Sequence, residues 1–187
     1  RPPPPLDPTA SAERVALRGR GGTCFVLVGA FAGLLCSLGF EVSLHTAVCA
    51  PDPPPDEKWG DHVVAIVHLP DGKYVADVGL GEGPQSPFRL APGSWEEHGF
   101  RYTLEERAEE GAWRFGNPDG VTGTAPGSRT ANEVPGFTVD VSSSLRTLRE
   151  CDAFHAYYWT HATSGYVRGP VTVLRPLGED GVLALRG

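Results

Sequence analysis

The sequence has 187 residues, enough for one domain or two small ones, and 40% of them are hydrophobic, as in globular proteins with a core. Its formal net charge of -7 and pI near 5.3 argue against a general nucleic-acid or membrane-surface binder, since such partners require a basic surface. The four cysteines form no Cys-x-x-Cys pair, which argues against a structural zinc site or a disulfide framework and favours a reducing cytoplasm.

The first part of the chain is rich in proline. Residues 1–10 are expected to be extended or disordered, because proline lacks an amide donor. A short helix is predicted over residues 11–17, with Ser11 as its cap. Residues 24–40 carry no charge, but they are few for a membrane span and include glycines. We therefore predict a buried helix that ends at Gly39.

The remainder of the chain is dominated by strand patterns. Alternation predicts a strand over residues 41–50, and a polar, proline-rich loop follows it. Two β-branched runs, 62–69 and 74–78, flank an Asp-Gly pair and predict an antiparallel hairpin. A helix is predicted at 145–160, and further strands are predicted at 101–105, 112–115, 166–175 and 182–186. A helix followed by strands with short connections predicts an α+β fold with an antiparallel sheet or barrel.

Cys24 begins the predicted apolar helix. Unpaired amides at a helix N-terminus favour a thiolate, which is the nucleophilic form of cysteine. The glycines before Cys24 allow close approach and leave donors that could stabilise an oxyanion. The alternative is a small buried cysteine, a description that suits Cys36, Cys49 and Cys151 better.

A nucleophilic cysteine requires a base, usually a histidine oriented by a third group. His62 and Asp77 lie on the two arms of the predicted hairpin and on one face of it. A symmetric turn about Asp-Gly pairs Asp77 with Ile66, about 13 Å along the strand from His62. We expect a bulge or an asymmetric loop to bring the two together, although Asp77 could instead cap the following glycine turn. The other histidines are expected to be solvated or hydrogen-bonded: His45, His68, His98, His155 and His161.

Three segments together resemble a known family. They are residues 20–24 (Arg-Gly-Gly-Thr-Cys), 61–64 (Asp-His-Val-Val) and 75–79 (Val-Ala-Asp-Val-Gly), with separations of 38 and 15 residues between the cysteine, histidine and aspartate. This order and spacing resemble the arylamine N-acetyltransferase family from about residue 10 onward. The resemblance implies that Cys24, His62 and Asp77 form a catalytic triad.

The resemblance also implies a domain organisation, that of a cysteine-proteinase-like arrangement. A partial helical domain over residues 11–50 carries the cysteine, after the proline-rich segment 1–10. A β-barrel domain over 51–140 carries the histidine and aspartate, and a partial α/β lid occupies 141–187. Relative to the family, the chain is expected to be truncated at both ends.

The implied reaction is a ping-pong acetyl transfer in the cytoplasm. Acetyl-CoA acylates the cysteine, an arylamine or hydrazine then accepts the acyl group, and no metal or nucleic acid takes part. We expect the glycine loop after Asp77 to contact coenzyme A through Gly79, Gly81 and Gly83, because glycines permit close backbone approach to phosphates. Phe25 and Leu80 are expected to line the substrate pocket.

Several residues depart from the family pattern. Val26 and Val28 stand where the family usually has Glu or Gln and an Asn, and Thr23 and Leu80 replace aromatic residues. These changes permit an amide synthase or a specialised acyltransferase that uses a carrier-protein or polyketide thioester. A non-catalytic binding module and a hydrolase or transglutaminase-like enzyme are further alternatives, since Cys, His and Asp serve those reactions too. The amine acceptor and the oligomeric state are left open.

Overall fold

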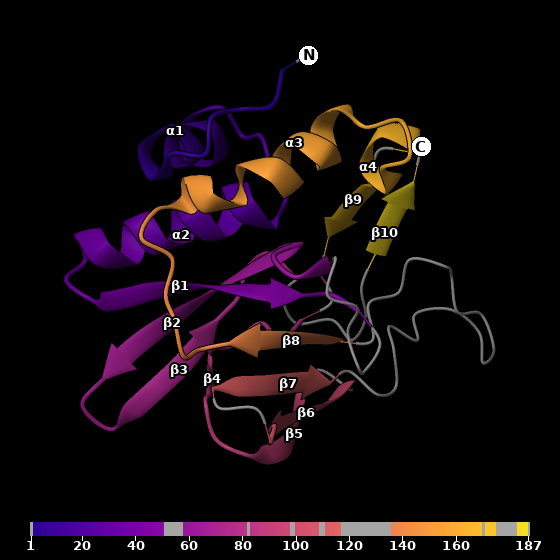
Figure 1. Ribbon diagram of the computed structural model, residues 1–187. Helices are drawn as coiled ribbons and strands as arrows, with labels where there is room; N and C mark the ends of the chain where they lie inside the picture. Colours follow the sequence, from indigo (N-terminus) through magenta and orange to yellow (C-terminus); the bar gives the residue numbers. More distant parts are fainter. Residues whose placement is uncertain are drawn as a thin grey trace.

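The computed structural model describes residues 2–50, 58–81, 83–97, 100–108, 111–116, 136–169, 171–174 and 183–186. It has an α+β fold in which helices cover one face of a curled antiparallel sheet (Figure 1), as predicted. The polar loop is predicted over residues 51–58; its residues 51–57 lie outside the described residues, as does His98.

The first helix begins earlier than predicted. Helix α1 (Pro8–Ala12) is capped by Asp7, whose carboxylate accepts the Ala10 amide at 2.9 Å, and it continues into a π-helical turn, η1 (Glu13–Leu17). A proline in the first turn suits a helix start, because its missing amide proton is not needed there. The prediction of Ser11 as the cap is therefore wrong. Ser11 is the fourth residue of α1, and it is buried.

The proline-rich segment before α1 packs against the domain. Its extended part ends at Asp7, so the expectation for residues 1–10 holds only for its first part. Leu6 is buried in the core, and the carbonyl of Pro4 accepts a hydrogen bond from His155 Nε2 at 2.8 Å. This segment is therefore part of the folded structure.

The predicted apolar helix is α2 (Cys24–Ser37). Its N-terminal part is buried against β1 and β2, but Leu34 and, just after the helix, Leu38 are exposed. The helix ends where predicted, with Gly39 at a φ of 91°, a conformation that glycine adopts without strain. Cys24 is thus held where the helix meets the sheet.

The larger sheet has eight strands among the described residues, in the order β4-β3-β2-β1-β8-β7-β6-β5, and each pairing is antiparallel. Strands β4, β5 and β8 were not predicted. The bounds are β1 (Glu41–Val48), β2 (His62–Leu69), β3 (Gly72–Ala76), β4 (Phe88–Arg89), β5 (Gly93–Glu97), β6 (Phe100–Glu106), β7 (Ala112–Gly116) and β8 (Gly136–Asp140).

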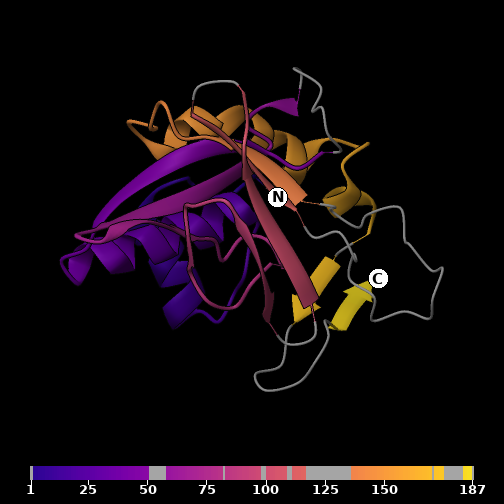
Figure 2. The ribbon, with the colours of Figure 1, turned by 90° about the horizontal axis from the view of Figure 1, so that it is seen from below.

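The sheet curls on itself, as Figure 2 shows from below, and it encloses a core rich in aromatic residues. Phe88 on one edge strand and Trp95 on the other lie with ring centroids 4.9 Å apart, so the two edges approach each other. Tyr102, Phe115 and Phe137 fill the interior with almost no exposed surface. Stacked aromatic rings of this kind contribute packing beyond their buried area, and they support the strands that carry the site.

The hairpin register differs from the predicted one. Ala65 pairs with Ala76 and Leu69 with Gly72, so the two-residue loop is Pro70-Asp71. The predicted pairing of Asp77 with Ile66 is wrong by two residues, because Ile66 pairs with Val75. Asp77 directly follows β3 and needs no bulge to approach His62.

The C-terminal part crosses the helical layer and ends in a small hairpin (Figure 1). The predicted helix at 145–160 is confirmed as η3 (Leu148–Cys151) and α3 (Asp152–Thr160). The predicted strand from Tyr166 is wrong at its start, because Ser164 Oγ accepts the Tyr166 amide and caps α4 (Gly165–Arg168). Strands β9 (Val171–Leu174) and β10 (Leu183–Arg186) pair beyond it.

In the described part of the chain, every helix is too short or too polar to cross a membrane.

Candidate active site

Cys24 lies at the first residue of α2 and is 6% exposed. The side chain of Thr23 before it makes no capping hydrogen bond, so the amides of the first helical turn are not satisfied by that hydroxyl. The Cys24 thiol donates to the backbone oxygen of Asp61, with Sγ and O 3.9 Å apart. The predicted nucleophile therefore sits at a helix start, beside the residue that precedes His62.

Gly79 packs directly against Cys24. A Cβ atom at this position would lie 2.6 Å from Cys24 Cβ and 2.8 Å from Cys24 Cα. Contacts this short leave no space for a side chain, so glycine is required here. The turn over residues 77–80 therefore packs closely against the start of α2.

His62 and Asp77 form a hydrogen-bonded pair at the adjoining ends of β2 and β3. His62 Nε2 lies 2.8 Å from Asp77 Oδ2, and each side chain is 3% exposed. The other carboxylate oxygen, Oδ1, accepts the amides of Gly79 at 2.7 Å and Leu80 at 3.3 Å. Asp77 thus fulfils both roles considered from the sequence, since it orients His62 and caps the glycine turn. With Nε2 engaged, Nδ1 is the ring nitrogen left to serve a thiol.

The electrostatics of the pair favour a charged imidazole. Burial by itself opposes the positive charge, but the nearby acidic groups outweigh it, with Asp77 both charged and hydrogen-bonded to the ring, and raise the pKa of His62 well above 6.5. An imidazole with a raised pKa holds a proton taken from a neighbouring thiol. The site can therefore stabilise a thiolate beside an imidazolium.

The other three cysteines differ from Cys24. Burial raises the pKa of Cys49 and of Cys151 to about 12, so both remain protonated thiols near neutral pH. Cys36 is exposed on α2, away from the helix start. The expectation that Cys36, Cys49 and Cys151 are small buried residues is confirmed for Cys151 and is wrong for Cys36, which is exposed. Cys49 is partly buried.

Asp61 and Tyr158 belong to the site but were missed from the sequence. The Asp61 carbonyl that accepts the Cys24 thiol also accepts the Tyr158 hydroxyl at 2.8 Å. The Asp61 carboxylate accepts the Cys49 amide at 2.8 Å. A backbone carbonyl has no residue-type signature, and 97 residues separate Asp61 from Tyr158, so no sequence signal indicated this contact.

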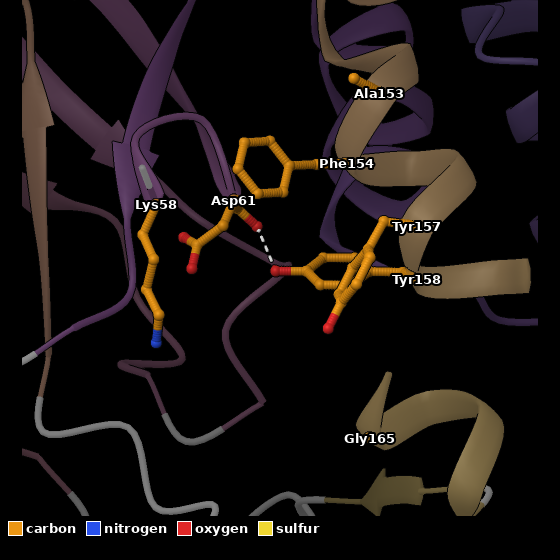
Figure 3. Close-up of a pocket in the computed structure, with 7 residues that line it drawn as sticks. All are labelled: Lys58, Asp61, Ala153, Phe154, Tyr157, Tyr158 and Gly165. Atoms are coloured by element: carbon orange, nitrogen blue, oxygen red, sulfur yellow. Dashed lines mark hydrogen bonds between the residues drawn. The ribbon is translucent and has the colours of Figure 1, made fainter. Parts of the chain in front are cut away.

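A pocket of roughly 530 Å³ opens beside this contact (Figure 3). Rings from α3 form one wall and the segment before β2 forms the other. Its lining comprises Lys58, Asp61, Ala153, Phe154, Tyr157, Tyr158 and Gly165.

The other predicted site residues have varied surroundings. The Gly79 amide is bonded to Asp77, and the Gly83 amide donates to Leu80 O at 2.9 Å, so neither is directed at a ligand. Gly81 is exposed, and Leu80 is partly buried against the sheet core. Phe25, expected in the substrate pocket, is fully buried and stacks on Tyr158 with centroids 5.9 Å apart.

A second polar cluster joins β1 to β2, and it runs from His45, which pairs with Val64, to His68 near the far end of β2. Ser43 Oγ lies 2.8 Å from His45 Nε2 and 2.7 Å from His68 Nε2, and His45 Nδ1 bonds the carbonyl of Ser143 at 2.8 Å. Both histidines are hydrogen-bonded, as predicted. Among the residues that the structure describes, no group of three His, Cys, Asp or Glu side chains could hold a metal ion.

A family model described as N-acetyltransferase matches residues 3–185. The arylamine N-acetyltransferase of Mycobacterium tuberculosis strain H37Rv is 36% identical over 112 residues, which are 56% of this chain and 39% of that protein. An N-malonyltransferase of Fusarium pseudograminearum is 34% identical over 100 residues, covering 47% of this chain and 29% of that protein.

The fold is shared with solved structures of the same kind. The Mycobacterium marinum arylamine N-acetyltransferase, solved in complex with CoA, superposes with a TM-score of 0.76 at 24% identity, covering 99% of this chain and 65% of that one. The chain thus spans less than two thirds of the length of these relatives.

Proposed function

Since the chain belongs to the arylamine N-acetyltransferase family, we propose that it transfers an acetyl or related acyl group from a coenzyme A thioester to an arylamine or hydrazine through a thioester on Cys24. The observation that carries the proposal is the buried His62–Asp77 pair beside a thiol at a helix start. These groups supply the base, the orienting carboxylate and the nucleophile that acyl transfer requires.

In the first half-reaction the Cys24 thiol gives its proton to His62, and the thiolate attacks the thioester carbonyl of the donor. The oxyanion that forms would lie near the amides that open α2. The carbon–sulfur bond to coenzyme A then breaks, and the departing thiolate takes the proton from His62. The products are an acyl thioester on Cys24 and free coenzyme A.

In the second half-reaction the amine attacks the acyl thioester. Its nitrogen forms the new bond to the acyl carbon and gives one proton to His62, while the bond to Cys24 breaks. The Cys24 thiolate then recovers its proton from the imidazolium. Asp77 keeps the imidazole in one orientation through both halves.

Coenzyme A is the proposed acyl-donor cosubstrate, and its contacts are assigned to Gly79, Gly81 and Gly83. Because the Gly79 and Gly83 amides are already paired, these contacts would depend on close approach to the chain rather than on those two donors. Support comes from the relative of Mycobacterium marinum that was solved with CoA. Phe25 and Leu80 remain the proposed lining of the amine pocket.

The arrangement of domains is part of the same proposal. We assign residues 11–50 to a helical domain, 51–140 to a β-barrel and 141–187 to an α/β lid, in the cysteine-proteinase-like manner that brings a helix-start cysteine to a strand-borne histidine. A cytoplasmic location is also proposed, because Cys24, Cys36, Cys49 and Cys151 are free thiols, as a reducing compartment favours.

A second candidate is transfer of a different acyl group from another thioester, as in an amide synthase. The relative named an N-malonyltransferase favours this alternative. So do Val26 and Val28, which are fully buried and present apolar surface where the family usually has polar residues.

Steady-state assays with a panel of donors test both candidates. Acetyl-CoA, malonyl-CoA and an acyl carrier-protein thioester are each supplied with an arylamine, and the released thiol and the amide are measured. Parallel double-reciprocal lines with acetyl-CoA, and no product from Cys24→Ala, support the first candidate. Turnover with the other thioesters alone supports the second. Equal product from Cys24→Ala, or acyl transfer only to water, contradicts the proposal.

A further inference from the structure

Tyr158 reaches the catalytic centre from α3. Its hydroxyl donates to the Asp61 carbonyl at 2.8 Å, and the Cys24 thiol donates to the same oxygen at a longer distance of 3.9 Å. Figure 3 shows the Tyr158 side chain directed from α3 toward this carbonyl. The phenol and the thiol therefore share one acceptor.

The Tyr158 ring is fixed by its neighbours. It stacks on the buried ring of Phe25 at 5.9 Å and 26°, and it contacts Tyr166 with centroids 5.0 Å apart and Phe154 at 6.4 Å. Phe25 directly follows Cys24 in α2, so the stack joins α3 to the helix turn that carries the nucleophile. The position of the hydroxyl is thus set by aromatic packing from both helices.

The charge environment keeps this hydroxyl protonated. Burial, with smaller contributions from nearby acidic groups, raises the pKa of Tyr158. The phenol is consequently a donor throughout the range in which enzymes work. Other titratable groups interact electrostatically with Cys24. They come from several elements: His62 of β2, Cys49 after β1, Cys151 of η3 and Tyr166 of α4.

An unshared carbonyl beside Cys24 would oppose ionisation of the thiol. Its partial negative charge attracts an S–H donor and repels a thiolate. A stronger O–H donor on the same oxygen reduces that charge and competes for its lone pairs. The Tyr158 hydroxyl therefore weakens the hydrogen bond between the Cys24 thiol and the Asp61 carbonyl. The thiol proton can then move more readily to His62.

We propose that Tyr158 is a positioning residue that acts through the Asp61 carbonyl to promote ionisation of the Cys24 thiol. This inference rests on the proposed function, because it assigns Tyr158 a part in activating the same nucleophile. The Tyr158 hydroxyl donates to the Asp61 carbonyl and not to the thiol or the base, so its effect is transmitted by one backbone oxygen.

The test is the pH profile of Cys24 alkylation by iodoacetamide, followed by peptide mapping so that exposed Cys36 is counted separately. No acyl donor is present. Tyr158→Phe keeps the ring stack and removes the hydroxyl; we expect alkylation at pH 7 to fall roughly three- to tenfold, the effect of one hydrogen bond, and its midpoint to move to higher pH. Tyr157→Phe is the matched control, because the Tyr157 hydroxyl bonds Thr163 instead, and its profile should equal that of the wild type.

A second variant keeps the proposal testable if Tyr158→Phe fails to fold. A fluorinated tyrosine at position 158 keeps the shape and donates more strongly, so the alkylation midpoint should move to lower pH. A midpoint that stays at the wild-type value in both variants overturns the proposal. If the midpoints move as expected but no thioester acylates Cys24, the role of Tyr158 stands and the proposed function fails. If acylation occurs with unmoved midpoints, the role of Tyr158 alone is rejected.

Discussion

The His62 imidazole and the Asp77 carboxylate meet at 2.8 Å, between the first residue of β2 and the residue that follows β3. A two-residue loop at Pro70-Asp71 sets this register, and at the other end of the hairpin Gly79 packs against Cys24. One hairpin thus positions His62 and Asp77, and the loop that follows it reaches Cys24.

Replacing Asp77 by asparagine should disable the base. The variant removes the carboxylate charge that helps to raise the pKa of His62, so the pKa of His62 should fall and its orientation should loosen. We expect alkylation of Cys24 at pH 7 to fall about a hundredfold or more. Asp71→Asn is the control, since Asp71 lies on the exposed turn of the same hairpin and bonds Tyr74. Equal rates in both variants would contradict the assignment of Asp77.

The pair should also make stability depend on pH. The pKa of His62 in the folded protein is above its unfolded value of 6.5, so the folded state binds the proton more tightly. Its contribution to the free energy of unfolding is therefore complete below pH 6.5 and is lost as the pH rises through the raised pKa. Urea unfolding of the wild type and of His62→Gln between pH 6 and 9 measures it. The difference between the two should shrink with rising pH, and a difference that grows would refute the sign.

A methyl group at residue 79 should disrupt the site. In Gly79→Ala the new Cβ would meet Cys24 atoms at 2.6 and 2.8 Å, and relieving this overlap should cost about 1–3 kcal/mol of stability. Cys24 should also react more slowly, because the loop that holds Asp77 has to move. Gly21→Ala has no atom within 4 Å of its new Cβ and should match the wild type in both measurements. Wild-type stability and reactivity in Gly79→Ala would rule out this close packing.

The cluster around Ser43 should be structural and independent of the site. In Ser43→Ala, His45 and His68 lose the hydroxyl that they share, which we expect to lower stability by about 1–3 kcal/mol. Ser43 pairs with Ile66, four residues along β2 from His62 and roughly 13 Å away in an extended strand, so Cys24 alkylation should not change. Thermal unfolding and peptide-mapped alkylation test the two halves of this expectation. Ser37→Ala, at an exposed hydroxyl, is the comparison.

The elements predicted from the sequence are those with strong local signals. The apolar run from Cys24, bounded by glycines, indicated α2, and the Asp-Gly pair between β-branched runs indicated the β2–β3 hairpin. The register was not predictable, because Pro-Asp and Asp-Gly are both plausible two-residue loops in the same sequence. Moving the loop by one residue changes the pairing by two.

The missed features depend on contacts between distant segments. Strand β8 (Gly136–Asp140) pairs with β1 through Ala47 and Val139, which lie far apart in the chain. Tyr158 stands in an aromatic stretch of α3 that equally suits a core helix, and its partner is a backbone oxygen. Residue-type patterns indicate the proposed nucleophile, base and carboxylate, but a carbonyl acceptor becomes visible only when the chain is folded.

The most direct measurement is the mass and position of an acyl group after the protein is mixed with acetyl-CoA in the absence of any amine. Intact-mass analysis and peptide mapping at short times should find one acetyl group on Cys24, absent in Cys24→Ala, slow to appear in Asp77→Asn and discharged when an arylamine is added. If acetyl-CoA leaves Cys24 unmodified while Cys36 or another residue is acetylated, the proposed active site is contradicted.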